Sequence, residues 1–299
     1  MNGKYADLAK EIPIHGRIGN IKLGSEMEED FFGWDTFSLR YCLVDDVGMI
    51  PEEMQTQHTH EYDQILLFIS AEPSDMLHLG AEVEVDLGPD NVRHLIAIPH
   101  GVAVPKGLPH FSPVVRRLDR PFFFISVNCT GKMAAAAADP NAVPMEGPWN
   151  KFMGEYSRLI QQLTFAVNDP YHYGSERSQP SGGVSCLLMG SEDSAFPLTT
   201  SWTTVHLPHH LGPWRDDGLY HPHKHPDNDE ALILLSLDQS NLTDLHGVAD
   251  FCVGDDGEDQ EHFTLTKATV MAMKRGTFHL PMTYLKVDRP SVFFTVGER

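Results

Sequence analysis

Short apolar segments recur along both ends of the chain, and polar turns separate them. Examples in the first half are QILLFIS, AEVEVDLG and FFFISV, at 64–70, 81–88 and 122–127. They are rich in β-branched and aromatic residues, and turn residues separate them about every 8–12 positions. This pattern predicts an all-β sandwich or barrel.

Helical periodicity is found only in the middle of the chain. The segment NKFMGEYSRLIQQLTFAV, at 150–167, has the spacing of an amphipathic helix. An alanine run at 134–144 precedes it, and a polar stretch rich in Pro and Gly at 168–183 follows it. Such a composition is typical of a linker. We therefore expect a linker over 131–199, with one helix at about 150–167.

The two ends of the chain repeat each other. GLPHFSPVVRRLDRPFFFISV (107–127) matches GTFHLPMTYLKVDRPSVFFTV (276–296) at a constant offset of 169 residues. Upstream, QILLFIS (64–70) matches EALILLS (230–236) at an offset of 166 residues. The repeated unit has roughly 100 residues. The sequence thus predicts two tandem β domains, residues 1–130 and 200–299, on either side of the linker.

Histidines stand at matching places in both copies. Each copy has an H-x-H pair before an apolar segment and a Gly-x-x-His turn about 50 residues later: His58, His60 and His110 in the first copy, and His223, His225 and His279 in the second. The chain has 17 histidines, so a single H-x-H pair is expected about once by chance. The repetition of the whole order is what indicates a function.

The spacing is compatible with metal binding. Residues i and i+2 of a strand share a face, so both histidines of an H-x-H pair are expected to point the same way. An imidazole from an opposing strand would complete three corners of a site. In the second copy, Glu230 offers a carboxylate as a fourth ligand. Three histidines with open positions are typical of catalytic rather than structural metal sites.

These residues resemble the motifs of the cupins, specifically of the two-domain bicupins. HTHEYDQ with PKGLPH in the first copy, and HKHPDNDE with KRGTFH in the second, are similar to the two cupin motifs. The resemblance covers both halves of the chain but not the linker. It implies two tandem double-stranded β-helix (jelly-roll) barrels, each with a metal inside. The implied ligand positions are His58, His60, Gln64 and His110, and His223, His225, Glu230 and His279.

The chain departs from the cupin pattern in several places. Gln64 stands where the family usually has Glu, so it is either a weak ligand or a hydrogen-bonding neighbour of a three-histidine site. Strand parity turns Asp63 away from the histidines. In the second copy Lys274 replaces the motif proline, and His221 is an alternative to His225 as a ligand. A further alternative is that one copy no longer binds metal.

Composition narrows the choice of partners and location. The 299 residues carry a net charge of −20, which disfavours nucleic acid and anionic membranes as partners but not a metal cation. The four cysteines lie far apart and predict reduced thiols rather than a disulfide framework. The sequence has no signal peptide and no long apolar run, so we expect a cytoplasmic protein.

The ligand set suits Fe(II) first, with Mn(II), Ni(II) and Zn(II) as alternatives. Few Lys or Arg residues lie near the motifs, which favours a neutral or weakly acidic small molecule as substrate. We therefore expect an enzyme, a metal-dependent oxygenase of the dioxygenase kind that acts on small aromatic or dicarbonyl compounds. A cupin isomerase, decarboxylase or lyase, and a non-catalytic small-molecule-binding bicupin, are the alternatives. The resemblance also implies a homodimer that pairs through sheet edges.

Overall fold

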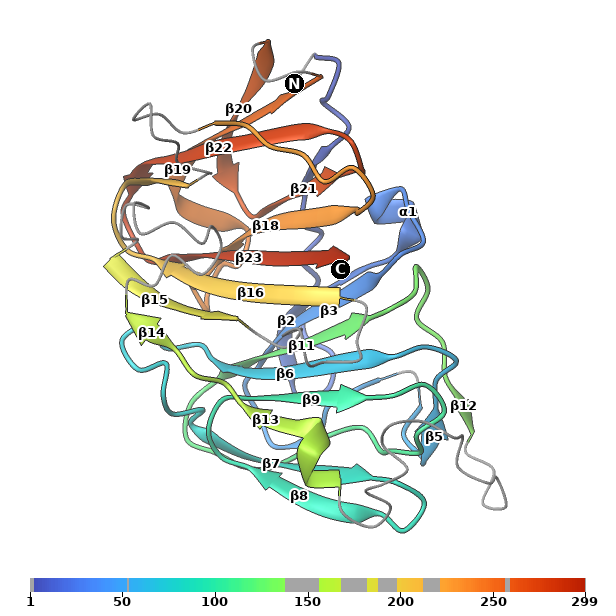
Figure 1. The fold of residues 1–299 in the computed structure, drawn as a ribbon. Helices are drawn as coiled ribbons and strands as arrows, with labels where there is room; N and C mark the ends of the chain where they lie inside the picture. The colour runs from blue at the N-terminus through green and yellow to red at the C-terminus, as the bar shows by residue number, and fades with distance from the viewer. Residues whose placement is uncertain are drawn as a thin grey trace. The chain divides into compact units, whose positions relative to one another are not determined.

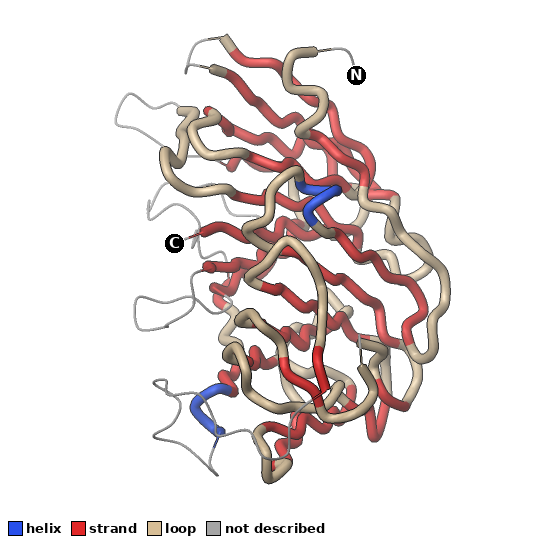
Figure 2. The backbone as a smooth tube through the Cα atoms, turned by 90° about the vertical axis from the view of Figure 1, so that its right-hand side faces the viewer, coloured by secondary structure: helices blue, strands red, loops and turns tan. Residues whose placement is uncertain are grey.

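The computed structural model describes residues 3–52, 54–137, 156–167, 182–187, 198–211, 221–255 and 259–298. The chain divides into two units, residues 13–163 and residues 1–12 together with 164–299. We call them the first barrel and the second barrel. Strands dominate both, and helical turns among the described residues occur only at α1 (Glu29–Phe32) and η2 (Tyr156–Leu159) (Figure 2).

The described residues of the first barrel form two main antiparallel sheets and a small third one. The larger sheet contains, in spatial order, β13 (Ile160–Gln162), β9 (His100–Val104), β6 (Gln64–Ser70), β11 (Phe122–Asn128), β3 (Ser38–Val44) and β2 (Ile21–Met27). The second contains β4 (Gly48–Met49), β10 (Val114–Leu118), β7 (Ala81–Leu87) and β8 (Val92–Ile96). The third pairs β12 (Ala136–Ala137) with β5 (His58–Thr59).

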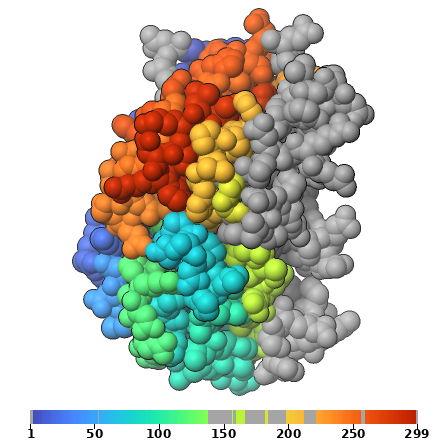
Figure 3. Space-filling view, turned by 90° about the vertical axis from the view of Figure 1, so that its left-hand side faces the viewer, coloured from blue at the N-terminus to red at the C-terminus, as the bar shows by residue number. Residues whose placement is uncertain are grey.

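The second barrel has two antiparallel sheets among its described residues. The larger contains, in spatial order, β1 (Ala9–Glu11), β21 (Thr269–Met273), β18 (Glu230–Ser236), β23 (Ser291–Glu298), β16 (Leu198–Val205), β15 (Gly182–Leu187) and β14 (Ala166–Val167). The smaller contains β17 (His209–Leu211), β22 (Phe278–Val287), β19 (Asp244–Gly254) and β20 (Gln260–Lys267). On the face in Figure 3, the segments of this barrel after residue 198, coloured gold to red, form a continuous surface.

The strand sequences explain which faces are buried. In β7, Ala81, Val83, Val85 and Leu87 contribute to the core of the first barrel, and acidic residues alternate with them. This alternation is that of a strand with one apolar and one polar face, and on the polar face Glu84 is itself only 7% exposed. β6 is buried at every position, as expected for an apolar strand that lies between β9 and β11. Each barrel therefore has a central apolar strand, which starts at position 64 or 230.

The duplication is visible in the topology. The order β9-β6-β11 in the first barrel recurs as β21-β18-β23 in the second (Figure 1). The predicted all-β architecture is thereby confirmed.

The helix expected over 150–167 is wrong for the part that the structure describes. Residues 156–167 form the 3₁₀ turn η2 and the strands β13 and β14, while 150–155 lie outside the described residues. β13 pairs with β9, with Ile160 opposite Val102, and Tyr156 is buried in the first core. Pairing with the free edge of a sheet satisfies backbone groups that a short helix would leave at its ends. No helix of the described residues is long and apolar enough to cross a membrane.

The observed units also differ from the predicted domains at the N-terminus. Residues 1–12 belong to the second barrel, because β1 pairs with β21 and places Ala9 opposite Met271. The first barrel likewise extends to residue 163, beyond the predicted limit at 130. β1 and β13 cover equivalent sheet edges, that of β21 and that of β9. Both strands come from outside the repeat, so the repeat itself does not reveal them.

Truncating Leu8 tests the role of the N-terminal segment. Leu8 is 8% exposed and packs in the core of the second barrel. We expect Leu8→Ala to lower the free energy of unfolding by about 2–3 kcal/mol, because it removes buried methyl groups. Glu11→Ala, which breaks the exposed pair with Lys267, is the control and should cost less than about 1 kcal/mol. Urea denaturation followed by circular dichroism measures both, and equal effects would contradict the assignment of residues 1–12.

Candidate metal centres

The structure brings His58, His60 and His110 together in the first barrel. His58 and His110 face each other across an isolated antiparallel bridge, with reciprocal backbone hydrogen bonds of 2.9 and 3.0 Å. The ring centroids of the three histidines lie 4.3 Å (58–110), 5.0 Å (58–60) and 5.0 Å (60–110) apart. One ring nitrogen of each lies within 4.8 Å of the others. We call this group the first centre.

The second barrel repeats this geometry at His223, His225 and His279. His223 and His279 form the equivalent bridge, with backbone hydrogen bonds of 3.0 and 2.8 Å. The centroids lie 4.4 Å (223–279), 5.0 Å (223–225) and 5.5 Å (225–279) apart. Glu230 adds a carboxylate oxygen within 4.8 Å of the three ring nitrogens, and His221 is not in the cluster. We call this group the second centre.

The turns that carry the third histidine have the same construction in both barrels. The Gly107 amide donates to the His60 carbonyl at 2.9 Å, and the Gly276 amide donates to the His225 carbonyl at 2.7 Å. Both glycines have positive φ, 75° and 81°, a conformation that other residues rarely adopt. This requirement explains the glycine of the Gly-x-x-His motif, since the turn brings the third histidine back beside the H-x-H pair.

The ring nitrogens are oriented by backbone carbonyls. Nδ1 lies at hydrogen-bond distance from a carbonyl oxygen in four of the histidines: 2.8 Å from His58 to Thr56, 2.8 Å from His60 to Ala134, 3.0 Å from His110 to Leu108 and 2.9 Å from His279 to Thr277. A carbonyl only accepts, so Nδ1 must donate, and Nε2 of a neutral ring then carries a lone pair. The same arrangement fixes the tautomer of histidines that bind metals.

Asp63 and Asp229 have a structural role beside the centres. The Asp63 carboxylate accepts from the Lys106 amide at 2.8 Å, and the Asp229 carboxylate accepts from the Arg275 amide at 2.9 Å. Each aspartate thus links the residue just before the central apolar strand to the Gly-x-x-His turn. This agrees with the prediction that Asp63 points away from the histidines.

The second centre is charged and partly open. Glu230 Oε2 lies 3.2 Å from His279 Nε2 and 3.4 Å from His225 Nε2. The hydrogen bond that His225 donates to the Glu230 carboxylate raises the pKa of His225, although partial burial of the ring acts in the opposite direction. The His225 side chain is 39% exposed. An ion and a further small ligand can therefore approach from the His225 side.

The first centre is neutral and buried. Gln64 occupies the position of Glu230, and its amide nitrogen donates to Ser126 Oγ and to Asn128 Oδ1, both at 3.0 Å. Its Oε1 is buried and has no hydrogen-bond partner among the described residues. The exposed fractions of the four residues are 0% for His58, 3% for His60, 1% for Gln64 and 1% for His110. Burial, followed by the neighbouring His58 and His60, holds the pKa of His110 well below its usual value.

A strap of residues 131–137 contributes to this burial. Its Ala134 carbonyl accepts from His60, and its Ala137 pairs with His58 as part of β12. Tyr62 stacks on His60 with centroids 4.7 Å apart, and its hydroxyl accepts from the Ala134 amide at 3.2 Å. The sequence pattern predicts a linker for this segment and does not reveal that it covers the first centre. The only sequence signal is an apolar alanine run where a polar linker was expected.

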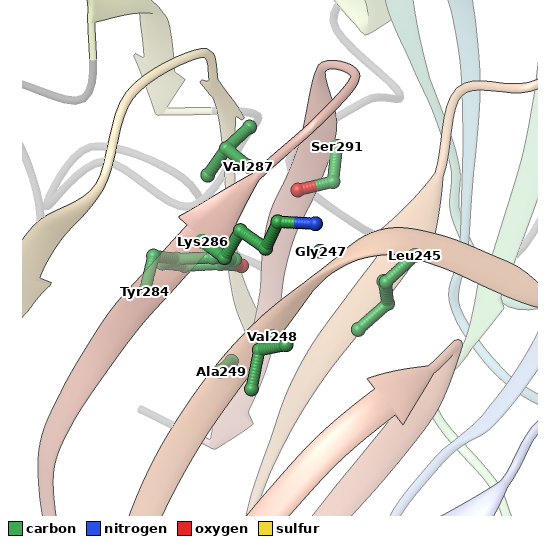
Figure 4. A pocket seen from close by; sticks show the side chains of 8 residues that line it. All are labelled: Leu245, Gly247, Val248, Ala249, Tyr284, Lys286, Val287 and Ser291. Atoms are coloured by element: carbon green, nitrogen blue, oxygen red, sulfur yellow. The ribbon is translucent and has the colours of Figure 1, made fainter.

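A cavity elsewhere in the second barrel is not a ligand site. It is lined by Tyr284, Lys286, Val287 and Ser291 among other residues (Figure 4). None of the candidate ligand histidines lines it, and it has no room for a water molecule. This cavity is therefore separate from the two histidine centres.

Comparisons with known proteins agree with this architecture. No family model and no curated protein sequence matches the chain. Among solved structures, Lactobacillus farciminis oxalate decarboxylase in a formate complex aligns with a TM-score of 0.60 and 13% identity, covering 100% of this chain and 88% of that chain. Bacillus subtilis oxalate decarboxylase, described with Mn(II) centres, aligns with a TM-score of 0.57 and 14% identity, covering 99% of this chain and 78% of that chain.

These similar structures identify the fold. Oxalate decarboxylases are bicupins, and the alignment extends over both barrels of this chain. The chain therefore has the bicupin fold, and the resemblance inferred from the histidine motifs is confirmed at that level. At 13–14% identity the likeness concerns the fold and not the reaction.

Removing the Glu230 charge tests the electrostatics of the second centre. In the metal-free chain, Glu230→Gln keeps an acceptor oxygen but removes the negative charge that strengthens this hydrogen bond and raises the His225 pKa, and it leaves the opposing effect of burial. We expect the His225 pKa to fall relative to the wild-type chain, as followed by NMR titration of the imidazole protons. Glu11→Gln, an exposed carboxylate paired with Lys267, is the control. An unchanged His225 pKa in Glu230→Gln would refute the contact.

Proposed function

We propose that this chain is a divalent-metal-dependent bicupin enzyme whose reaction takes place at the second centre. The observation that carries the proposal is the repeated histidine triangle, to which the described residues add a carboxylate and access from solvent in the second barrel but not in the first. The predicted metal ligands of the second centre are His223, His225, Glu230 and His279.

The donor atoms fit a divalent transition ion. In the first centre, Nε2 of His58 and of His110 is buried and has no hydrogen-bond partner among the described residues. Leaving such a polar atom unsatisfied costs about 1–3 kcal/mol, which coordination would offset. Imidazole nitrogens with one oxygen donor suit Fe(II), Mn(II), Ni(II) or Zn(II). Fe(II) remains our first choice, and the Mn(II) centres of the B. subtilis protein support Mn(II) as the alternative.

The protein residues prepare the second centre for a small oxygen-donor substrate. A divalent ion bound there would supply a Lewis acid that polarises a substrate oxygen. The carbonyl partner of His279 holds that ring in register. Glu230 neutralises part of the positive charge and lies within reach of His225, at the exposed side of the site.

The nearby cations support a neutral or weakly acidic substrate. Lys224 lies between the two histidines of the H-x-H pair, but its Nζ packs 4.7 Å from the centroid of the Phe278 ring. Arg275 Nη2 pairs with Asp229 at 2.9 Å. Both charges are thus engaged elsewhere, whereas a site for a strongly anionic substrate would normally direct them at the ligand. This favours the oxygenase of small aromatic or dicarbonyl compounds.

A decarboxylase is the second candidate, because the similar solved structures are oxalate decarboxylases. Parallel measurement of O₂ uptake and CO₂ release separates the two, with a β-diketone, a catechol and oxalate as probes. Stoichiometric O₂ uptake with the first two supports the oxygenase. CO₂ release without net O₂ uptake supports the decarboxylase. No turnover with fully loaded protein would favour a non-catalytic binding protein. The cytoplasmic location and the homodimer stay predictions.

Metal content tests the ligand assignment directly. We expect elemental analysis to find about one divalent ion for each histidine centre, because both donor sets suit such an ion. His223→Ala should lose one of them, and His58→Ala should lose the other. His221→Ala, which changes a neighbouring histidine outside the cluster, should lose neither. Wild-type metal content in both ligand variants would contradict the proposal.

Comparison of equivalent ligands tests which centre carries the reaction. We expect His225→Ala to lower kcat/KM by about 100-fold or more, because it removes a donor at the open site. His60→Ala should have the smaller effect, since it alters the closed centre, and His221→Ala should match the wild type. Steady-state kinetics of all three variants are measured with whichever of the β-diketone, the catechol and oxalate the wild-type enzyme turns over. A larger loss in His60→Ala would place the reaction in the first barrel.

A further inference from the structure

A third group of metal-binding side chains lies on the second barrel, apart from both histidine centres. It consists of Asp250 and Cys252 on β19 and His262 on β20. These strands are neighbours in the smaller sheet, at its edge (Figure 1). Ala249, Phe251 and Val253 lie in the barrel core, so the alternate residues Asp250 and Cys252 share the outer face of the sheet.

The register of the two strands brings the three side chains together. Cys252 is directly opposite His262. His262 Nδ1 lies 2.7 Å from Asp250 Oδ2, and Cys252 Sγ lies 3.5 Å from Nδ1 and 3.9 Å from Nε2 of the same ring. One donor atom from each residue lies within 4.8 Å of the others. The ring edge thus stands between a thiol and a carboxylate.

The accessibility of the group suits an ion that arrives from solvent. The His262 side chain is 63% exposed, and Asp250 is 24% exposed. Cys252 is 6% exposed, at the floor of the group. If His262 and Asp250 formed only an ion pair, the thiol beneath them would have no part in it. A metal chelate uses all three side chains as donors. The net charge of −20 also favours the approach of a cation.

We propose that Asp250, Cys252 and His262 form a surface site for one thiophilic divalent ion of the zinc class. Sulfur, imidazole nitrogen and carboxylate oxygen are the donors that Zn(II) prefers, and solvent completes the tetrahedron. The site joins β20, the edge strand of its sheet, to β19, and so restrains the edge. It is independent of the proposed enzymatic function.

Binding exchanges a proton for the ion without any change in oxidation state. Burial, followed by the Asp250 charge, raises the pKa of the Cys252 thiol to about 12. The thiol is therefore protonated in the metal-free chain at neutral pH. The ion forms a bond to sulfur, and the thiol proton leaves to solvent.

Co(II) titration of the full chain distinguishes this site from the two histidine centres. Only this cluster contains a thiol among the described candidate ligands, so it alone should give thiolate-to-cobalt charge-transfer absorption in the near ultraviolet. We expect the band to reach at saturation the intensity of about one thiolate-bound Co(II) per chain in the wild type, whatever Co(II) the histidine centres also take up. Zn(II) should displace the Co(II) and abolish this band.

Three variants decide the outcome. Cys252→Ser should abolish the band, and His262→Gln, a change at an exposed side chain, should weaken the apparent Co(II) affinity by about tenfold or more. Cys186→Ser in the same barrel is the matched control and should keep the wild-type band. A band that survives Cys252→Ser, one that Cys186→Ser removes, or none in the wild type at saturating Co(II) overturns the assignment.

Discussion

The candidate sites depend on one backbone contact, made twice. A pair of reciprocal hydrogen bonds joins the first histidine of each H-x-H segment to the histidine of the Gly-x-x-His turn, at 58–110 and at 223–279. Because the contact involves main-chain atoms, it fixes the separation of the Cα atoms whatever the side chains are. Carbonyl partners at Nδ1 then set the rings. The result is a preorganised triangle of nitrogens, which is the condition for selective metal binding.

The two copies share this backbone and differ in what surrounds it. Position 64 faces Asn128 across the strands, and position 230 faces Gly297. Asn128 and Ser126 hold the Gln64 amide through its nitrogen. Gly297 brings no side chain, and a Cβ added at this position would meet Glu230 Cγ at 3.6 Å, an ordinary contact distance. The strap at 131–137 closes the first centre further. Duplication thus provided one framework, and a few side chains made the two centres unequal.

The repeat and the histidine order could be read from the sequence because both follow local rules. Strand periodicity identified β6 and β18, and the parity of H-x-H indicated which rings share a face. The strands β1 and β13 could not be predicted, because each pairs with the edge strand of a sheet that is distant in the sequence, β1 with β21 and β13 with β9. Residues 156–167 had helical spacing, yet tertiary pairing outweighed that propensity. The hydrogen bonds of Gln64 to Ser126 and Asn128 could not be predicted from the sequence, because these residues lie 62 and 64 positions away on another strand.

The donor and acceptor pattern around Gln64 explains why an amide suits the first centre better than a carboxylate. Asn128 Oδ1 accepts from Gln64 and from Ser126, while Asn128 Nδ2 donates to Ser38 Oγ at 3.3 Å. A carboxylate at position 64 would bring an acceptor toward that acceptor oxygen, so the network would have to reverse. An amide is neutral, so it would not compensate either positive charge of a divalent ion. In a buried site such an uncompensated charge is costly. An ion at the first centre would therefore need an anionic ligand of its own, whereas Glu230 would supply that charge in the second.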